Sequence, residues 1–179
     1  MAELSNTKTA LLGLLSERPM HPYQIEKEVK YRDMRFWTDL SMSSIYKLLK
    51  DLEEDGLVDR TNEISSENRL RKLYAISSEG KKALRKKLKE LLIKPEHIRW
   101  QIDIGTYNSD LLPLKTVQTT LEKYRSTLKE KIESYEALLN FLKESGCPTH
   151  RFAVATRPIF LLKGEIEWVD LYLSDIKQG

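Results

Sequence analysis

The sequence is short of the residues that carry redox chemistry and of those that interrupt helices. It has one cysteine, seven glycines and six prolines in 179 residues. The single thiol, Cys147, has no partner for an internal disulfide, which is typical of a protein from a reducing compartment. Few glycines and prolines, with abundant leucine, lysine and glutamate, predict a mainly helical protein with little room for a large sheet.

Long apolar stretches and an export signal are missing as well. No hydrophobic run approaches the about 18 residues that a membrane-spanning helix needs. The first 15 residues do not combine a basic start, a long apolar stretch and a small-residue cleavage site. We therefore expect no membrane partner and a cytoplasmic protein.

The sequence also lacks the patterns of known catalytic and metal sites. His21, His97 and His150 are far apart in the chain and do not have the spacing of a zinc site. There is no GxSxG, P-loop or GxGxxG pattern, and most carboxylates are scattered among lysines on helical segments. We expect no enzyme activity, no metal and no cofactor.

The net charge of the whole chain is small, but one segment of it is strongly basic. The 30 basic and 27 acidic side chains leave a net charge of +3. Between Arg69 and Lys89, nine side chains are basic and only Glu79 is acidic, so the rest of the chain has a net charge of −5. A local cationic segment of this kind can neutralise several phosphates, which indicates nucleic-acid binding.

The beginning of the chain has the pattern of two helices separated by a turn. Apolar residues fill most of residues 7–15, this helix ends before Pro19, and Pro22 is typical of the first turn of the next helix. The connection that follows is expected to pack its aromatic residues, Phe36 and Trp37, onto the core.

Residues 41–56 have the clearest helix signals. Ser41 is a favourable N-cap, and Gly56 is a favourable residue just past the helix end. At about 100° per residue, one side of the helix is apolar and the other is polar. Small hydroxyl residues at its start and two lysines further along suit entry into a DNA major groove. A plain solvent-exposed face is the alternative.

A hairpin and a further helix follow. Residues 56–61 and 70–76 have strand patterns with a polar turn between them, and residues 77–80 open another helix. The order helix, helix, helix, two-stranded hairpin, helix is that of a winged helix-turn-helix domain.

Three ordered segments resemble the PadR family of bacterial winged-helix transcription regulators, in the subgroup whose long helical carboxy-terminal domain is shared with virulence activators. The segments are residues 10–23, 40–58 and 69–80, and they lie within about the first 85 residues. Two features depart from the family pattern. Pro22 stands where the family usually has glycine, and the wing turn Ser65–Asn68 lacks the common glycine.

The resemblance implies a homodimer that binds an inverted-repeat operator in double-stranded DNA. It implies major-groove contacts from Ser43, Ser44, Tyr46, Lys47 and Lys50. It implies contacts to phosphates or the minor groove from Arg69, Arg71 and Lys72. Base contacts would set the sequence preference, and phosphate contacts would set the affinity and its salt dependence.

The second half of the chain predicts two long helices. Apolar residues recur in steps of three and four from Val117 to Leu142 and again from Ile159 to Ile176. We expect a second copy of the chain to cover these stripes, because an inverted-repeat operator requires two-fold symmetry. A purely intramolecular helical bundle is the alternative. The side chains expected at the dimer interface are Leu121, Leu128, Ile159, Leu162, Ile166, Val169, Leu173 and Ile176.

The same resemblance implies a pocket for a planar apolar ligand in several relatives. Trp100, Trp168 and Tyr172 are the candidates for such a pocket here. The alternative is that these aromatic residues belong to a core or an interface, where they bury a large area.

The sequence therefore predicts a mainly α protein: a winged helix-turn-helix DNA-binding domain with a two-stranded wing (1–94), a connecting segment (95–112) and a helical dimerisation domain (113–179). The expected function is sequence-specific transcriptional repression in a bacterial cell, with a small hydrophobic or aromatic effector releasing the operator. Two alternatives stay open: an activator with the same DNA-binding mode, and a helical adaptor that uses the winged fold to bind a protein.

Overall fold

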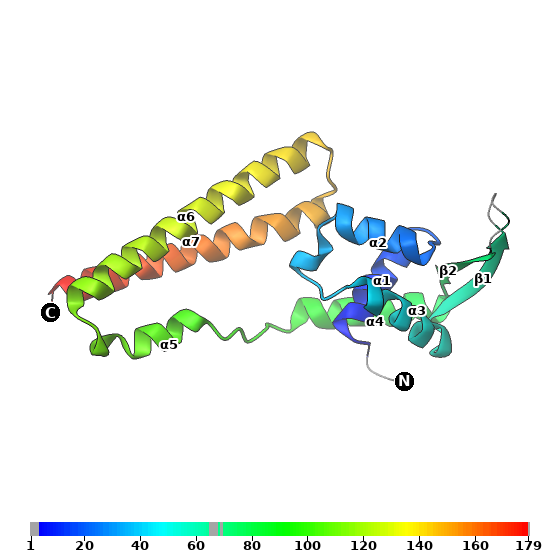
Figure 1. Ribbon diagram of the computed structural model, residues 1–179, viewed down its shortest axis with the longest axis horizontal. Helices are drawn as coiled ribbons and strands as arrows, with labels where there is room; N and C mark the ends of the chain where they lie inside the picture. Colours follow the sequence, from blue (N-terminus) through cyan, green and yellow to red (C-terminus); the bar gives the residue numbers. More distant parts are fainter. Residues whose placement is uncertain (1–3, 65–67, 69, 179) are drawn as a thin grey trace. The chain divides into compact units, whose positions relative to one another are not determined.

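The computed structural model describes residues 4–64, 68 and 70–178. The chain forms two compact units, Met1–His97 and Ile98–Gly179. Helices dominate both units, and the first also contains a two-stranded antiparallel sheet (Figure 1). The prediction of a mainly helical protein is confirmed.

The first unit has the predicted order of elements. It contains α1 (Asn6–Leu15), α2 (Pro22–Tyr31), the 3-10 turn η1 (Met34–Phe36), α3 (Met42–Glu54), β1 (Val58–Ile64), β2 (Leu70–Ile76) and α4 (Ser78–Ile93). The predicted winged helix-turn-helix architecture is therefore confirmed. Arg69 and residues 65–67 of the predicted wing turn lie outside the described residues.

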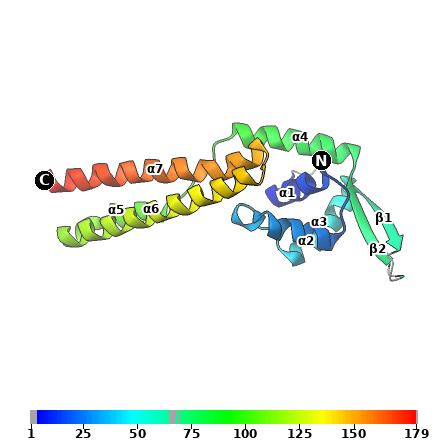
Figure 2. The ribbon, with the colours of Figure 1, turned by 90° about the horizontal axis from the view of Figure 1, so that it is seen from above.

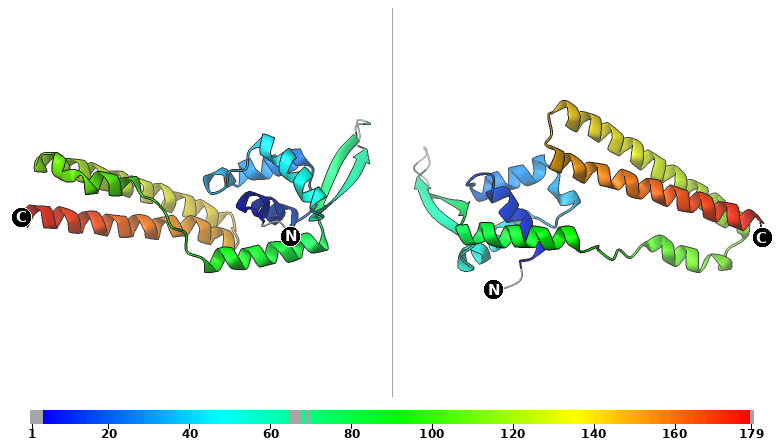
Figure 3. Two further views of the ribbon diagram at one scale, coloured as in Figure 1. Left: turned by 90° about the horizontal axis from the view of Figure 1, so that it is seen from below. Right: turned by 180° about the vertical axis from the view of Figure 1, so that it is seen from behind.

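Helix α1 forms the middle layer of the first unit. Its Leu11 and Leu12 are fully buried, and burial of a leucine side chain contributes about 1.5–3 kcal/mol. Helix α4 lies on one side of α1, and α2 and α3 lie on the other (Figures 2 and 3). The outer faces of α3 and α4 are consequently on different sides of the unit.

The base of the wing is anchored to the turn between α1 and α2. The Met20 N–H donates to the Tyr74 carbonyl at 2.9 Å, and the Tyr74 N–H donates to the Met20 carbonyl at 3.1 Å. Met20 is fully buried. Within the hairpin, Glu63 of β1 lies opposite Arg71 of β2. The pairing with Met20 holds β2 against the helical core.

The aromatic residues that follow α2 do not join the core. Phe36 and Trp37 are 74% and 54% exposed, so the prediction that they pack onto the core is wrong. Met34 takes the buried position in this segment instead. The Arg35 Nε–H donates to the Leu40 carbonyl at 3.0 Å and holds the connection before α3.

The second unit consists mainly of two long helices. After α5 (Gln101–Tyr107) and the 3-10 turn η2 (Ser109–Leu111), α6 (Leu114–Glu144) and α7 (Thr149–Gln178) form an antiparallel hairpin (Figure 1). Gly146 in the turn between them has a φ of 66°, which glycine adopts without strain. The predicted pair of long helices is confirmed. The predicted connecting segment contains α5 and η2.

The apolar stripes of α6 and α7 pack on each other within one chain. Val169 is fully buried, and Leu121, Leu128 and Leu173 are at most 6% exposed in the same cluster. Leu162, Ile166 and Ile176 pack against that cluster, and Ile159 is also buried. The residues expected at the dimer interface therefore lie in an intrachain seam, and their part in a dimer interface stays a prediction.

Polar contacts flank this seam. Arg125 pairs with Asp170 at 2.6 Å. The Tyr124 hydroxyl donates to a Glu165 carboxylate oxygen at 3.1 Å. Burial, and then the hydrogen bond to Glu165, raise the pKa of Tyr124 to about 12. These contacts fix the register of α6 against α7.

Candidate nucleic-acid interface

Helix α3 begins with a reciprocal capping arrangement. The Ser41 hydroxyl accepts from the Ser44 N–H at 3.2 Å, and the Ser44 hydroxyl accepts from the Ser41 N–H at 2.8 Å. These bonds satisfy amides that the helix start would leave unpaired. The Ser44 side chain, a predicted DNA contact, is thus engaged in the cap. Ser43, the neighbouring predicted contact, is exposed.

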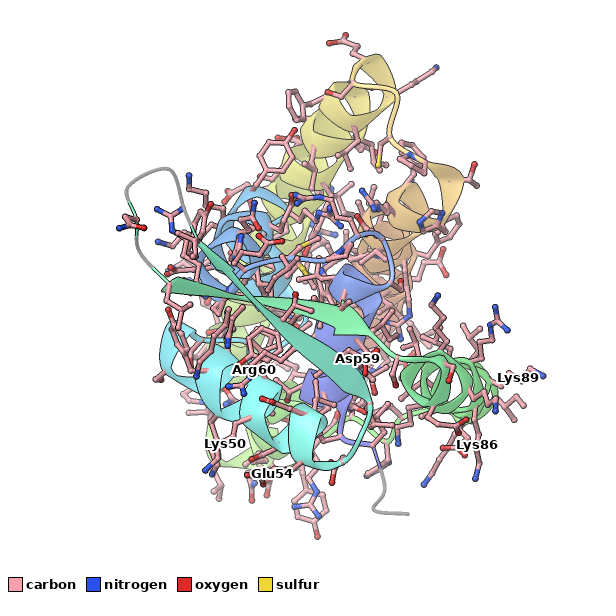
Figure 4. The ribbon with its side chains drawn as sticks, turned by 90° about the vertical axis from the view of Figure 1, so that its right-hand side faces the viewer. Lys50, Glu54, Asp59, Arg60, Lys86 and Lys89 are labelled. Atoms are coloured by element: carbon pink, nitrogen blue, oxygen red, sulfur yellow. The ribbon has the colours of Figure 1, made fainter. Side chains whose placement is uncertain are left out.

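The outward face of α3 presents the other predicted contacts from this helix. Tyr46 is 55% exposed, and Lys47 is exposed beside it. Lys50 lies 3.6 Å from Glu54, and both side chains are mostly exposed (Figure 4). Exposed ion pairs of this kind contribute about 0–1 kcal/mol. Lys50 can therefore exchange Glu54 for a phosphate at little cost.

The wing adds two predicted cations. Lys72 is exposed on β2, and Arg71 is half-buried on the same strand. The Arg71 guanidinium lies 5.8 Å from the centre of the Tyr23 ring, and the Lys27 ammonium lies 5.7 Å from it. Contacts between a cation and an aromatic face at exposed sites contribute about 0.5–1 kcal/mol each. Tyr23 therefore positions cations next to the wing.

His21 joins the start of α2 to both strands of the wing. Its Nδ1 lies 2.9 Å from the Lys72 carbonyl oxygen on β2, and its Nε2 lies 3.4 Å from a Glu63 carboxylate oxygen on β1. The imidazole also stacks on Tyr23, with 5.8 Å between ring centres. One side chain thus sets the position of the wing relative to α2.

These side chains line one open groove of about 1000 Å³ between α3, the start of α2 and the wing. Tyr46 and Lys50 line it from α3, and Arg71 and Lys72 line it from β2. The structure thus brings four of the predicted DNA contacts together around one concave surface. Four cations line the groove against two carboxylates, those of Glu53 and Glu54. This excess of positive charge, together with the Tyr46 hydroxyl, suits a polyanion such as DNA whose base edges can be contacted.

The sequence does not reveal three further residues of this groove. His21, Tyr23 and Arg60 line it as well. Arg60 Nε lies 3.0 Å from a Glu53 carboxylate oxygen. Tyr74 lies beneath these groups, where burial, reinforced by the charge of Glu53, raises the pKa of its hydroxyl. Long-range pairing of β2 with the rest of the unit assembles these residues.

The three aromatic ligand candidates lie in the second unit and are not equivalent. Trp168 and Tyr172 stack with 5.8 Å between ring centres, and both pack against the seam of α6 and α7. The Tyr172 hydroxyl lies 2.8 Å from the Ser109 hydroxyl of η2. Trp100 precedes α5 and is 44% exposed.

In the part of the chain that the structure describes, no three His, Cys, Asp or Glu side chains are grouped so that they could hold a metal ion. The described helices are each too short or too polar to cross a lipid bilayer.

Comparison with known protein families finds a match: the sequence model of the "Transcriptional regulator PadR-like family" matches residues 11–86. This range runs from α1 into α4 and includes every residue of the groove. Residues 11–86 therefore form a PadR-like domain, and the resemblance predicted from the sequence is confirmed. The chain is a PadR-like transcriptional regulator, and members of the PadR family are transcriptional regulators and not enzymes.

Full-length relatives extend the likeness to the second unit. The chain is 24% identical over 176 residues to the negative transcriptional regulator PadR of Bacillus subtilis (strain 168), which covers 94% of this chain and 96% of that protein. The solved complex of Bacillus subtilis PadR with operator DNA has a TM-score of 0.74 at 22% identity, and covers 94% of this chain and 98% of that one.

Two other solved structures share the fold. Bacillus subtilis PadR in complex with p-coumaric acid has a TM-score of 0.76 at 21% identity, with 99% of this chain and 98% of that chain covered. The Vibrio cholerae virulence activator AphA has a TM-score of 0.66 at 17% identity, with 97% and 99% covered. The PadR-like fold thus spans both units.

Replacing His21 by alanine is expected to loosen the wing of this PadR-like domain. The variant loses the contact with the Lys72 carbonyl and the contact with Glu63, so the amides of β1 and β2 should exchange hydrogen faster. Hydrogen exchange followed by mass spectrometry measures this directly. His97→Ala, at an exposed position outside the described helices and strands, is the control. Equal protection of the wing in both variants would contradict the role of His21.

Proposed function

We propose that this regulator represses transcription in the bacterial cytoplasm by binding an inverted-repeat operator in double-stranded DNA as a homodimer. The groove carries the proposal, because it unites Tyr46 and Lys50 of the expected recognition helix with Arg71 and Lys72 of the wing. Bacillus subtilis PadR, which has this fold, is a negative transcriptional regulator and has been solved with operator DNA.

The side chains around the groove divide into two roles. Ser43, Tyr46 and Lys47 lie on the outward face of α3 and contact base edges in the major groove. The Lys50 ammonium contacts phosphates, and Ser44 holds the start of α3 in place through the cap with Ser41. Arg71 and Lys72, together with Arg69, contact the DNA backbone from the wing, which positions α3 without reading sequence.

Replacing Arg71 and Lys72 by glutamine is expected to weaken binding to every DNA sequence. The plot of log Kobs against log salt should become shallower by about 3.6 for the dimer, since two phosphate contacts are lost in each subunit and each contributes about 0.9. The ratio of operator to non-operator affinity should stay the same. Fluorescence anisotropy with operator and unrelated duplexes, over a range of salt concentrations, measures both quantities.

A matched control for this test lies on α6. Lys123→Gln with Lys131→Gln removes the same charge at exposed positions of the second unit and should leave the slope unchanged. An unaltered slope in the Arg71 and Lys72 variant would contradict the wing contact. Wild-type protein whose binding to unrelated duplex does not depend on salt would favour the adaptor function instead.

The homodimer has to bury apolar side chains that one chain leaves exposed. The seam between α6 and α7 is already filled within the chain. By contrast, Ile104, Tyr107 and Leu111 of α5 and η2 are 70%, 87% and 78% exposed, and Phe160 of α7 is 74% exposed. Covering apolar area contributes about 25 cal/mol per Å². We place the main dimer contact at these side chains. The seam residues contribute indirectly, because they pack α6 against α7 and so hold this surface in place.

The variant with Ile104→Ser and Tyr107→Ser is expected to shift the protein from dimer to monomer. Both substitutions remove exposed apolar surface and leave the seam intact. Sedimentation equilibrium gives the mass directly. The control is Tyr31→Ser, at an 88% exposed tyrosine of the first unit. A dimer of unchanged affinity in the double variant would rule out α5 as the interface.

A small planar apolar effector is the proposed signal that releases the operator. The stacked pair of Trp168 and Tyr172, with Trp100, supplies the aromatic surface in the second unit. Bacillus subtilis PadR has been solved with p-coumaric acid. Titration with a panel of phenolic acids and hydrophobic drugs should change tryptophan fluorescence and weaken operator binding. If no compound of the panel changes either tryptophan fluorescence or operator binding, the proposed effector is contradicted.

A further inference from the structure

The largest concentration of positive charge in the first unit lies on α4 and not on the expected recognition helix. Helix α3 has two basic and three acidic residues, whereas α4 has six basic and two acidic residues. The groove lined by α3 therefore accounts for only part of the cationic segment that the sequence shows. The charges of α4 need an explanation of their own.

Five cations of α4 share one face. At about 100° per residue they fall within an arc of about 140°, and all are exposed. Gly80 and Leu84 are buried on the opposite side, against the core. We call this surface the α4 cationic face, and its members are Lys81, Lys82, Arg85, Lys86 and Lys89.

Only one of the five cations on the α4 cationic face is paired with an acidic side chain that the structure describes. Lys82 pairs with Glu79 at 2.7 Å. The other four members form no ion pair with any residue that the structure describes. Like charges four residues apart destabilise a helix by about 0.2–0.5 kcal/mol per pair. Helix stability therefore does not explain this arrangement, and a polyanionic partner does.

The spacing of these cations fits a nucleic-acid backbone. Lys81, Arg85 and Lys89 are successive residues of an i, i+4 row, which spans about 12 Å along the helix axis. Phosphates of one DNA strand follow one another at about 3.4 Å along the duplex axis. The row thus extends along three or four phosphates. The members of the face are all lysine or arginine, and their even spacing along the helix suits phosphates that repeat regularly along the backbone.

This face lies away from the groove. Helix α1 separates α4 from α2 and α3 (Figures 2 and 3). Lys86 and Lys89 project from the outer side of α4, whereas Lys50 lies at the far edge of the unit on α3 (Figure 4). A straight duplex seated against α3 is therefore not the duplex that α4 contacts.

We propose that the α4 cationic face binds the backbone of a second DNA segment while the groove holds the operator. This inference rests on the proposed function for the first segment only. The second contact is independent of sequence and strongly dependent on salt, and it lets one regulator bridge two stretches of duplex. It adds a bridging activity to operator recognition.

A capture assay tests the bridge with full-length protein. Wild-type protein is bound to an immobilised operator duplex, and a fluorescent duplex of unrelated sequence is then added. We expect capture of the second duplex at low salt and its release as the salt concentration rises. In the variant Lys81→Gln, Arg85→Gln, Lys86→Gln, Lys89→Gln, capture should fall about tenfold or more. Retention of the operator by the same variant shows that it is folded.

The control variant loses the same charge elsewhere. It carries Lys115→Gln, Lys123→Gln, Lys129→Gln and Lys131→Gln, all at exposed positions of α6, and should capture the second duplex as wild type does. A dimer has two grooves, so any capture that survives in the α4 variant measures the grooves alone.

Each other outcome has a definite meaning. Equal capture by the α4 variant and wild type overturns the proposal. Wild-type protein that holds the operator but no second duplex also overturns it and leaves the proposed function standing. Capture of polyglutamate in place of duplex overturns it in favour of an acidic protein. Wild-type protein that binds no operator contradicts the proposed function, and tethered protein then tests the α4 cationic face with unrelated duplex alone.

Discussion

The variant Tyr46→Ala with Lys47→Ala is expected to lose about 30-fold or more of its preference for the operator, because each base contact discriminates by about 1–3 kcal/mol. Affinity for unrelated duplex should change much less, since the phosphate contacts of Lys50, Arg71 and Lys72 remain. Both substituted side chains are exposed on α3, so the core is untouched. Competition of operator against a scrambled duplex measures the preference.

The control keeps the same residue types at positions outside the groove. Tyr31→Ala with Lys123→Ala removes one exposed tyrosine and one exposed lysine and should preserve the operator preference. Sedimentation should show the same mass for all three proteins. Full operator preference in the Tyr46 and Lys47 variant would contradict the assignment of α3 as the recognition helix.

Replacing Gly80 by alanine is expected to destabilise the first unit by about 3 kcal/mol, at the upper end of the usual range for overpacking. A Cβ at this position would collide with the Leu57 carbonyl oxygen and lie 2.9 Å from Ile76 Cγ1. Leu57 leads into β1 and Ile76 ends β2. The backbone at the base of the wing must therefore move, which should also lower DNA affinity.

Thermal or urea unfolding followed by circular dichroism measures this loss. Gly13→Ala is the matched control, because Gly13 lies inside α1 and a Cβ there meets no atom within 4 Å. That substitution should stabilise the protein by about 0.5–1 kcal/mol. A Gly80→Ala variant as stable as Gly13→Ala would contradict the close packing of α4 on the base of the wing.

Local signals in the sequence were sufficient to predict most helices of this protein. Ser41 and Gly56 mark the two ends of α3, and the structure shows the predicted N-cap and a positive φ of 70° at Gly56. Pro22 marks the start of α2. Capping and periodicity depend on residues that are near in sequence, so these features are readable without a structure.

Long-range contacts explain what the sequence did not reveal. His21 and Tyr23 reach the groove because β2 pairs with Met20, which no local pattern indicates. Phe36 and Trp37 have the composition of core residues, yet Met34 occupies the core position. A hydrophobic residue type alone does not determine which side chain of a short connection is buried.

The sequence also does not show in which direction a charged or apolar face points. The cationic segment is visible in the sequence, but only the layering of α4 behind α1 shows that most of its charge points away from the groove. Likewise, apolar residues at intervals of three and four predict an apolar stripe along a helix, but they do not show which surface covers that stripe. The structure fills the stripes of α6 and α7 from within one chain, as Val169 shows.

Selection of bound DNA from a random pool is the decisive experiment for operator recognition by this protein. A homodimeric winged helix that reads bases through α3 should enrich an inverted repeat whose half-sites are about one helical turn apart, roughly 10 base pairs from centre to centre. The same selection with the Tyr46 and Lys47 variant should enrich no such motif. Enrichment of no motif by the wild-type protein, or of one unrepeated site, would contradict operator recognition by a two-fold symmetric dimer.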